Sequence, residues 1–210
     1  TAYAVEWLPE AWFVLLFGVF AIYLVLDGFD FGVGLLYATR EDESDRELLH
    51  AAFGPLWKAN EVWFVLFVKV LFAAYPSVYA NLLSRHYLLV FVLLLGLILR
   101  GIGVKLRKER DDDRWKRSCD YAFVIGSAIS PLALGYLLVR WVFPDLPLSV
   151  TLLGAVSLLA LCLVLGAAFL VLKTDGALQR EMGFYLRTGV LGYSSLFVLT
   201  GGTLFVLDVV

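Results

Sequence analysis

The chain has 210 residues, of which 61% are hydrophobic and 17% are charged, and its mean hydropathy is +0.84. Soluble globular domains are usually about 45–50% apolar, so this composition excludes that class. It predicts an all-α integral membrane protein that crosses the bilayer several times. The formal net charge of −2 is too small to indicate nucleic acid as a partner.

Six segments are long and apolar enough to cross a bilayer as helices, which takes roughly 20 residues each. We predict a first four-helix bundle within residues 1–142, and two further helices of an incomplete second bundle within residues 143–210. Prolines at 76, 144 and 147 fall between the spans, where helices are expected to break. The predicted spans are 9–37, 55–75, 82–104, 118–142, 150–172 and 183–207.

The lysines and arginines are concentrated in the loops that follow the first, third and fifth spans. The loop after the third span alone carries seven of them, between Lys105 and Arg117. Because cytoplasmic loops have an excess of Lys and Arg, we expect these three loops in the cytoplasm and the N-terminus outside. We interpret the acidic residues among them, in EDESDRE and ERDDDR, as solvated loop charges.

The first span contains two carboxylates inside an apolar run, AIYLVLDGFDFGVGLLY. At 1.5 Å per residue, Asp30 lies roughly 10 Å and Asp27 roughly 15 Å from the predicted cytoplasmic end of this helix. By the same arithmetic, Glu61 lies roughly 9 Å inside the second span and Arg100 roughly 6 Å inside the third. Four charged residues from three helices are thus expected in the cytoplasmic half of the membrane.

A charge that faces lipid costs several kcal/mol, so such residues face a bundle interior or a water cavity. Asp27 and Asp30 are three residues apart and share a helix face. We therefore predict one polar cluster between the first three spans, in which acids at stepped depths relay protons. The alternative is that Arg100 and Glu61 form an ion pair that only fixes the register of the helices.

Two glycines next to the acids, Gly28 and Gly32, form a small-xxx-small face that allows another helix to approach closely. We expect close packing at this face and burial of Asp27 to occur together. The two histidines, His50 and His86, are predicted at opposite sides of the membrane. They cannot ligate one haem between them, and no cysteine cluster is present, so we expect no haem on this chain.

Five stretches resemble subunit II of the cytochrome bd-type quinol oxidases, in that family's order and spacing. They are LDGFDFGVG, GPLWKANEVWFV, LFAAYPSVYANLLS, GLILRGIGVKLR and RWKRSCDYAFVIGS. The resemblance implies a prokaryotic plasma-membrane complex with a haem-bearing subunit I. That partner oxidises quinol and reduces dioxygen, using two b-type haems and a d-type haem. It also implies a haem-free subunit II, which in some members holds a structural quinone.

The resemblance further implies a proton path from the cytoplasm to the oxygen site. Matched by position, the path transfers to Asp27 and Asp30. To these we add Glu61, Lys58 and Asn60 as predicted path residues, with Arg100 as charge partner. Trp57 and Trp63 are expected to pack between helices.

The chain departs from the family pattern in two ways. Lys58 stands where many relatives have an acid, and Glu61 where others have Gln or His. Either the acid has moved by one helical turn, or protons enter differently. Relatives usually have eight spans, so two helices lie outside the given sequence, the second bundle is short, or another chain completes it.

The sequence is compatible with three functions. The chain is an oxidase subunit that delivers protons, a scaffold that only stabilises subunit I, or a cation-coupled secondary transporter. The third would use a first helix that is broken at its glycines. No second span mirrors DGFDFG, which disfavours the transporter.

Overall fold

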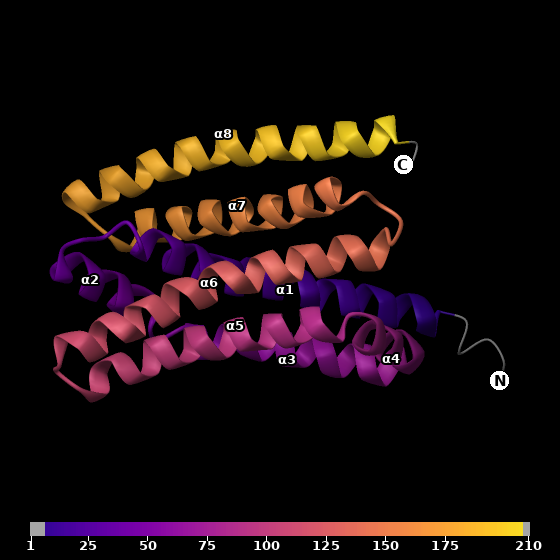
Figure 1. Ribbon diagram of the computed structural model, residues 1–210, viewed down its shortest axis with the longest axis horizontal. Coiled ribbons are helices and arrows are strands. Elements are labelled where there is room, and N and C mark those ends of the chain that lie inside the picture. The colour runs from indigo at the N-terminus through magenta and orange to yellow at the C-terminus, as the bar shows by residue number, and fades with distance from the viewer. Residues whose placement is uncertain (1–6, 208–210) are drawn as a thin grey trace.

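The computed structural model describes residues 7–207, and within that range it is all α-helical, as predicted. The long helices lie side by side along the longest axis of the molecule, with α2 at one end and α4 at the other (Figure 1). The elements are α1 (Leu8–Tyr37), α2 (Glu43–Phe53), α3 (Trp57–Ala74), α4 (Pro76–Arg85), α5 (Tyr87–Leu106), the 3₁₀ turn η2 (Arg107–Glu109), α6 (Asp113–Val142), α7 (Leu148–Lys173) and α8 (Gly176–Val206).

Five helices of the described chain, α1, α5 with η2, α6, α7 and α8, are long and apolar enough to cross a membrane. A sixth crossing results when α3 and α4 are taken together, although they bend by 117° at Tyr75. The bend arises because Pro76 has no N–H for the preceding helix and suits the first turn of a new one. The predicted third span, 82–104, is therefore wrong at its start, because residues 82–85 belong to α4.

The interpretation of EDESDRE as a loop is wrong from Glu43 onward, because α2 begins there, whereas most of its acidic residues are exposed as expected. Glu43 and Asp45 lie in its first turn, where carboxylates interact favourably with the helix dipole. Leu49 and Phe53, four residues apart, are buried against the bundle. The predicted starts of the fourth and sixth spans, 118 and 183, are likewise late, since α6 and α8 begin several residues earlier.

Helix α1 is the central element of the bundle. It contacts α2, α3, α6 and α7, whereas α5 pairs with α6 and α8 packs along α7. It is one continuous helix from Leu8 to Tyr37, through all three glycines of DGFDFGVG. The broken first helix that the transporter hypothesis needs is therefore not present.

Glycines allow α1 and α7 to touch at their backbones. A Cβ atom at Gly32 would overlap the backbone of Gly166, and the reverse is also true. One turn earlier, a Cβ at Gly28 would come within 2.9 Å of Leu165 Cδ1. The Gly28/Gly32 face thus packs against α7, and Asp27 beside it is fully buried.

Candidate functional site

A buried ion cluster joins the three helices in which the sequence places charges. Nη2 of Arg100 on α5 lies 2.6 Å from Asp27 Oδ1 on α1 and 2.7 Å from Glu61 Oε1 on α3. Asp27 and Arg100 are 0% and 1% exposed, whereas the Glu61 side chain is 30% exposed. One guanidinium therefore holds two carboxylates from different helices, and only one of these carboxylates is accessible.

Asp30 lies one turn from Asp27 on the same helix and is also fully buried. Its Oδ2 atom accepts a hydrogen bond of 3.0 Å from Asn60 Nδ2, and Asn60 also donates to the carbonyl of Leu26. The Arg100 guanidinium carbon lies 4.4 Å from the centre of the Phe31 ring, within reach of a cation–π interaction. Three carboxylates thus lie in one cluster with one cation, which contacts two of them, Asp27 and Glu61, so the cluster holds more acidic groups than one positive charge can neutralise.

The predicted site residues are not all in this cluster. Asp27, Asp30, Glu61, Asn60 and Arg100 are brought together as described. Lys58 is exposed, and its Nζ lies over the ring of Trp57 at 5.7 Å from the ring centre.

The two predicted packing tryptophans lie partly buried between helices. Trp57 packs against the apolar cluster around Tyr37 and Phe123. Trp63 packs against the clusters around Phe67 and Tyr23.

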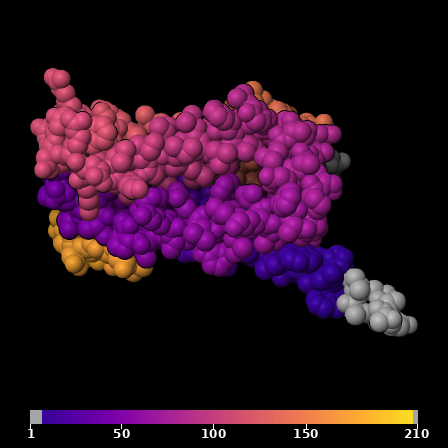
Figure 2. Space-filling view, turned by 90° about the horizontal axis from the view of Figure 1, so that it is seen from below, coloured from indigo at the N-terminus to yellow at the C-terminus, as the bar shows by residue number. Residues whose placement is uncertain are grey.

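A large apolar groove separates α3 from α5 and reaches the ion cluster. Its volume is about 810 Å³, and Asp27 and Glu61 contribute to its wall. Tyr79 and Leu82 of α4 line it at the bent end of α3. Figure 2 shows the corresponding hollow in the surface, beside α4. The groove gives an apolar ligand a lateral route to an ionisable site.

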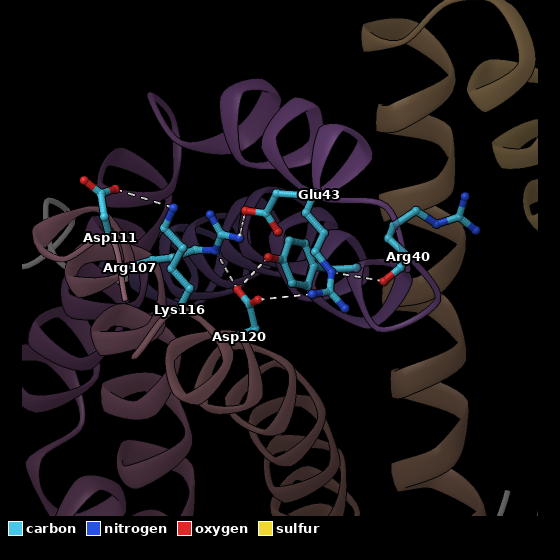
Figure 3. A network of polar contacts seen from close by, with 8 residues as sticks. Arg40, Glu43, Arg107, Asp111, Lys116 and Asp120 are labelled. Carbon is cyan, nitrogen blue, oxygen red and sulfur yellow. Dashed lines mark hydrogen bonds and ion pairs between the residues drawn. The ribbon is translucent and has the colours of Figure 1, made fainter. Parts of the chain in front are cut away.

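A second polar network ties α1, α2 and η2 to α6 at the predicted cytoplasmic end (Figure 3). Asp120 Oδ1 accepts hydrogen bonds of 2.6 Å from both the Tyr37 hydroxyl and Arg107 Nε. Asp120 Oδ2 lies 3.4 Å from Arg46 Nη1, and Arg107 also donates to Glu43 at 2.5 Å. Each partner comes from a different element, so Asp120 fixes how these elements meet.

Sequence reasoning missed this network. The sequence analysis used Arg40, Arg46 and Arg107 only to assign loops to the cytoplasmic side of the membrane, although Arg40 and Arg107 are buried. Arg40 pairs with Glu181 and thereby joins the end of α1 to α8. The available signal was Asp120 itself, a carboxylate that the predicted fourth span already contains.

His50 of α2 lies buried next to the Asp120 network. Its ring is 5.0 to 5.6 Å, centre to centre, from the rings of Tyr37, Phe53 and Phe123. Burial, together with the nearby Arg107 charge, lowers the pKa of His50 from 6.5 to about 4. Because these three rings surround His50, a positive charge on its imidazole would lie inside a packed aromatic cluster.

The described residues 7–207 contain no group of three His, Cys, Asp or Glu side chains that could hold a metal ion. His50 on α2 and His86 after α4 lie at opposite ends of the bundle (Figure 1). They are therefore too far apart to be axial ligands of one haem.

Comparison with known proteins agrees with the motifs. A sequence model of the family described as cytochrome bd terminal oxidase subunit II matches residues 8–210. The chain belongs to this family. Its several apolar helices, together with its bacterial relatives, make it a multi-pass protein of the plasma membrane. The predicted resemblance and location are thus confirmed.

Three relatives illustrate the similarity. Cytochrome bd ubiquinol oxidase subunit 2 of Bacillus subtilis is 35% identical over 192 residues, covering 83% of this chain and 56% of the relative. Cytochrome bd-I ubiquinol oxidase subunit 2 of Escherichia coli K12 is 37% identical over 124 residues, covering 58% and 32%. A probable cytochrome oxidase subunit 2 of Haemophilus influenzae is 32% identical over 131 residues, covering 62% and 35%. The chain spans about half the length of the first relative and about a third of the other two.

The environment of His50 predicts a specific loss of stability in mild acid. Between pH 6.5 and about 4 the unfolded chain binds a proton at His50 and the folded chain does not. The unfolded state therefore gains stability as the pH falls through this window. The thermal unfolding midpoint should drop between pH 7 and pH 4.5 by more in the natural protein than in His50→Phe, which keeps the aromatic contacts. Equal drops in both proteins would contradict this origin of the acid sensitivity.

Proposed function

We propose that this chain is the haem-free subunit of a quinol oxidase and that its ion cluster carries protons from the cytoplasm toward the oxygen-reducing site. Its partner would be a haem-bearing subunit I that oxidises quinol and reduces dioxygen. The proposal draws on membership of the subunit II family and on relatives whose names state a ubiquinol oxidase. The b-type and d-type haems would belong to the partner.

The observation that supports proton transfer is a cluster of three carboxylates around one cation inside the bundle, of which Asp27 and Glu61 contact the cation. A lone ion pair would serve to fix helix register, and Arg100 with Glu61 alone would suffice for that. Asp27 and Asp30 add two fully buried acids that a scaffold does not need. Buried acids in excess of the neighbouring positive charge are favoured in their protonated, neutral form, and such protonated carboxyls can pass a proton on.

The partly exposed Glu61 would receive the proton first, because it is the one carboxylate of the cluster that is not fully buried. Arg100 contacts both Glu61 and Asp27 and would keep the two carboxylates close while the proton moves inward. Asn60 would hold Asp30 in place through its hydrogen bond. Lys58, which is exposed over Trp57, would act only as a surface charge near this entry.

The role of Asp27 can be tested by a change of one atom. Asn at this position keeps the size of Asp27 and can still accept a hydrogen bond from Arg100, but it carries no exchangeable carboxyl proton. We expect Asp27→Asn to lower the oxygen-reduction rate of the purified complex by about 10²-fold or more, the usual contribution of a proton-transfer group. The measurements are oxygen consumption with excess quinol and the reduced-minus-oxidised haem spectrum.

The matched control is Asp145→Asn, which makes the same change at an exposed position between α6 and α7. It should leave both measurements unchanged. Normal turnover of Asp27→Asn with an intact haem spectrum would contradict proton delivery and leave only a scaffolding role. Loss of the haem spectrum would instead assign Asp27 to assembly of the complex.

We further propose that the groove between α3 and α5 holds a structural quinone. The site must accept a long apolar isoprenoid tail and a small polar head. Its walls are predominantly apolar and its volume is about 810 Å³, and Glu61 and Trp57, which are four residues apart on α3, are among its lining residues. When bound, a quinone could supply redox chemistry, but a permanently bound tail would also seal the ion cluster from lipid.

Narrowing the groove tests this second proposal. Gly101 of α5 lines the groove, and a Cβ atom there would lie 3.7 Å from the Trp57 ring. We expect Gly101→Leu to reduce the quinone extracted from the purified complex at least about tenfold. Gly192→Leu is the control, since no described atom lies within 4 Å of that position. An equal quinone content in both variants would contradict the assignment.

A further inference from the structure

A small charged pocket lies between α2 and α6, near the first turns of both helices and at the predicted cytoplasmic end of the bundle. Figure 3 shows part of its wall. The residues that line it are Glu43, Arg46, Asp113, Lys116, Arg117 and Asp120. Its volume is about 220 Å³, whereas pockets for drug-sized ligands take about 300–1,000 Å³. The pocket therefore suits a small, charged head group.

Two of the three carboxylates in this pocket already have a cationic partner. Arg107 donates to Asp120 at 2.6 Å and to Glu43 at 2.5 Å. The Tyr37 hydroxyl also donates to Asp120. When Arg107 is counted with the lining residues, four cationic side chains meet three carboxylates. The site thus keeps an excess of one positive charge.

The three basic side chains that line the pocket have donor groups to spare. Arg46 is held by a backbone carbonyl through Nε, and its Nη1 atom lies 3.4 Å from Asp120. Lys116 Nζ lies 3.6 Å from the exposed Asp111. Arg117 is exposed and takes part in no ion pair within residues 7–207. Because guanidinium and ammonium groups bind phosphate well, these side chains can hold a phosphate group without breaking the short hydrogen bonds of Asp120.

An exposed apolar column on α6 leads from the pocket toward the membrane interior. Arg117, Tyr121 and Ile125 are spaced by four residues and share one face of the helix. Tyr121 is 63% exposed and Ile125 is 46% exposed. Arg117 precedes Tyr121 by roughly 6 Å along the helix axis, and the interfacial zone of a bilayer is about 5–8 Å deep on each side. With Tyr121 at the edge of the hydrocarbon core, where tyrosines are enriched, Arg117 lies at the level of the lipid phosphates.

The surrounding segment carries the charge that attracts an anionic membrane surface. Residues 105–117 contain seven Lys and Arg but only four Asp and Glu. Basic segments next to a membrane helix attract anionic lipids of the cytoplasmic leaflet, and basic pockets between helices on this side bind lipid head groups.

We propose that the pocket between α2 and α6 binds the phosphodiester group of an anionic phospholipid, with Arg46, Lys116 and Arg117 around the phosphate and an acyl chain along Tyr121 and Ile125. The single negative charge of such a lipid offsets the single excess positive charge of the site. Since Arg46 belongs to α2 and the other two cations to α6, the lipid ties these helices together. The proposal concerns a surface apart from the ion cluster and does not depend on the proposed function.

Photo-crosslinking with two lipid probes tests the proposal. The purified complex is reconstituted into phosphatidylcholine vesicles that contain a small fraction of phosphatidylglycerol with a diazirine on one acyl chain, or of phosphatidylcholine with the same chain. After illumination, peptide mass spectrometry measures the label on the segment that contains Tyr121 and Ile125. We expect at least about tenfold more label from the phosphatidylglycerol probe, the combined effect of three nearby basic residues. Equal label from the two probes would overturn the proposal.

Substitutions in the pocket should reduce this preference. Arg117→Gln should lower the ratio of the two labels about fivefold, and Lys116→Gln combined with Arg117→Gln should lower it further. Arg117→Lys keeps the charge and should keep most of the preference, which separates loss of charge from misfolding. The matched control is Arg114→Gln, since Arg114 is an exposed residue of the same helix that does not line the pocket. Equal ratios for Arg117→Gln and Arg114→Gln would contradict the assignment.

Inorganic phosphate distinguishes a lipid site from a site for a free anion. An excess of phosphate, compared with chloride at the same ionic strength, should leave the label unchanged, because phosphate has no acyl chain to place along Tyr121 and Ile125. Displacement of the phosphatidylglycerol probe by phosphate would assign the pocket to a free anion and refute the lipid.

Discussion

The shared guanidinium of Arg100 is the interaction on which the packing of α1, α3 and α5 depends. It contacts Asp27 on α1 and Glu61 on α3 from its own position on α5, so three helices meet at one cation. Because α3 and α5 are otherwise separated by the groove, this contact bridges them. In an apolar medium neither the cation nor the carboxylates tolerate the loss of their partner. The stability of this part of the fold and the proposed function therefore depend on the same few atoms.

The remaining architecture protects this cluster on its other sides. Gly32 and Gly166 bring the backbones of α1 and α7 into contact and leave no space for lipid beside Asp27. At the predicted cytoplasmic end, Asp120 holds Tyr37, Arg46 and Arg107 together and fixes the lower part of α1 against α6. The side toward α3 and α5 is the part left accessible, through the groove and the partly exposed Glu61. Among residues 7–207, the proposed proton entry at Glu61 and the proposed ligand groove thus lie on the same side of the cluster.

The sequence was sufficient to predict the buried charges but not the polar groups around them. Asp27, Asp30, Glu61 and Arg100 stand out because each interrupts an apolar span, and their depths follow from the helical rise. Helix α2 and the start of α6 were missed because their charged residues satisfy one another through contacts far apart in sequence, such as Arg107 with Glu43 and Asp120. The break at Pro76 was predicted, but the separate helix α4 and its bend of 117° from α3 required the three-dimensional path of the chain.

The central claim is that Arg100 and Asp27 are coupled as a buried charge pair, and a double-mutant comparison of stability tests it most directly. Arg100→Leu alone leaves a carboxylate without its cation and should cost about 3–5 kcal/mol. Adding Asp27→Asn removes the uncompensated charge, so the double variant should be more stable than Arg100→Leu despite carrying one more substitution. Thermal unfolding of the purified complex in one detergent measures all four proteins of the cycle. If the two substitutions instead destabilise the protein additively, Arg100 and Asp27 are not coupled and the account of the cluster is wrong.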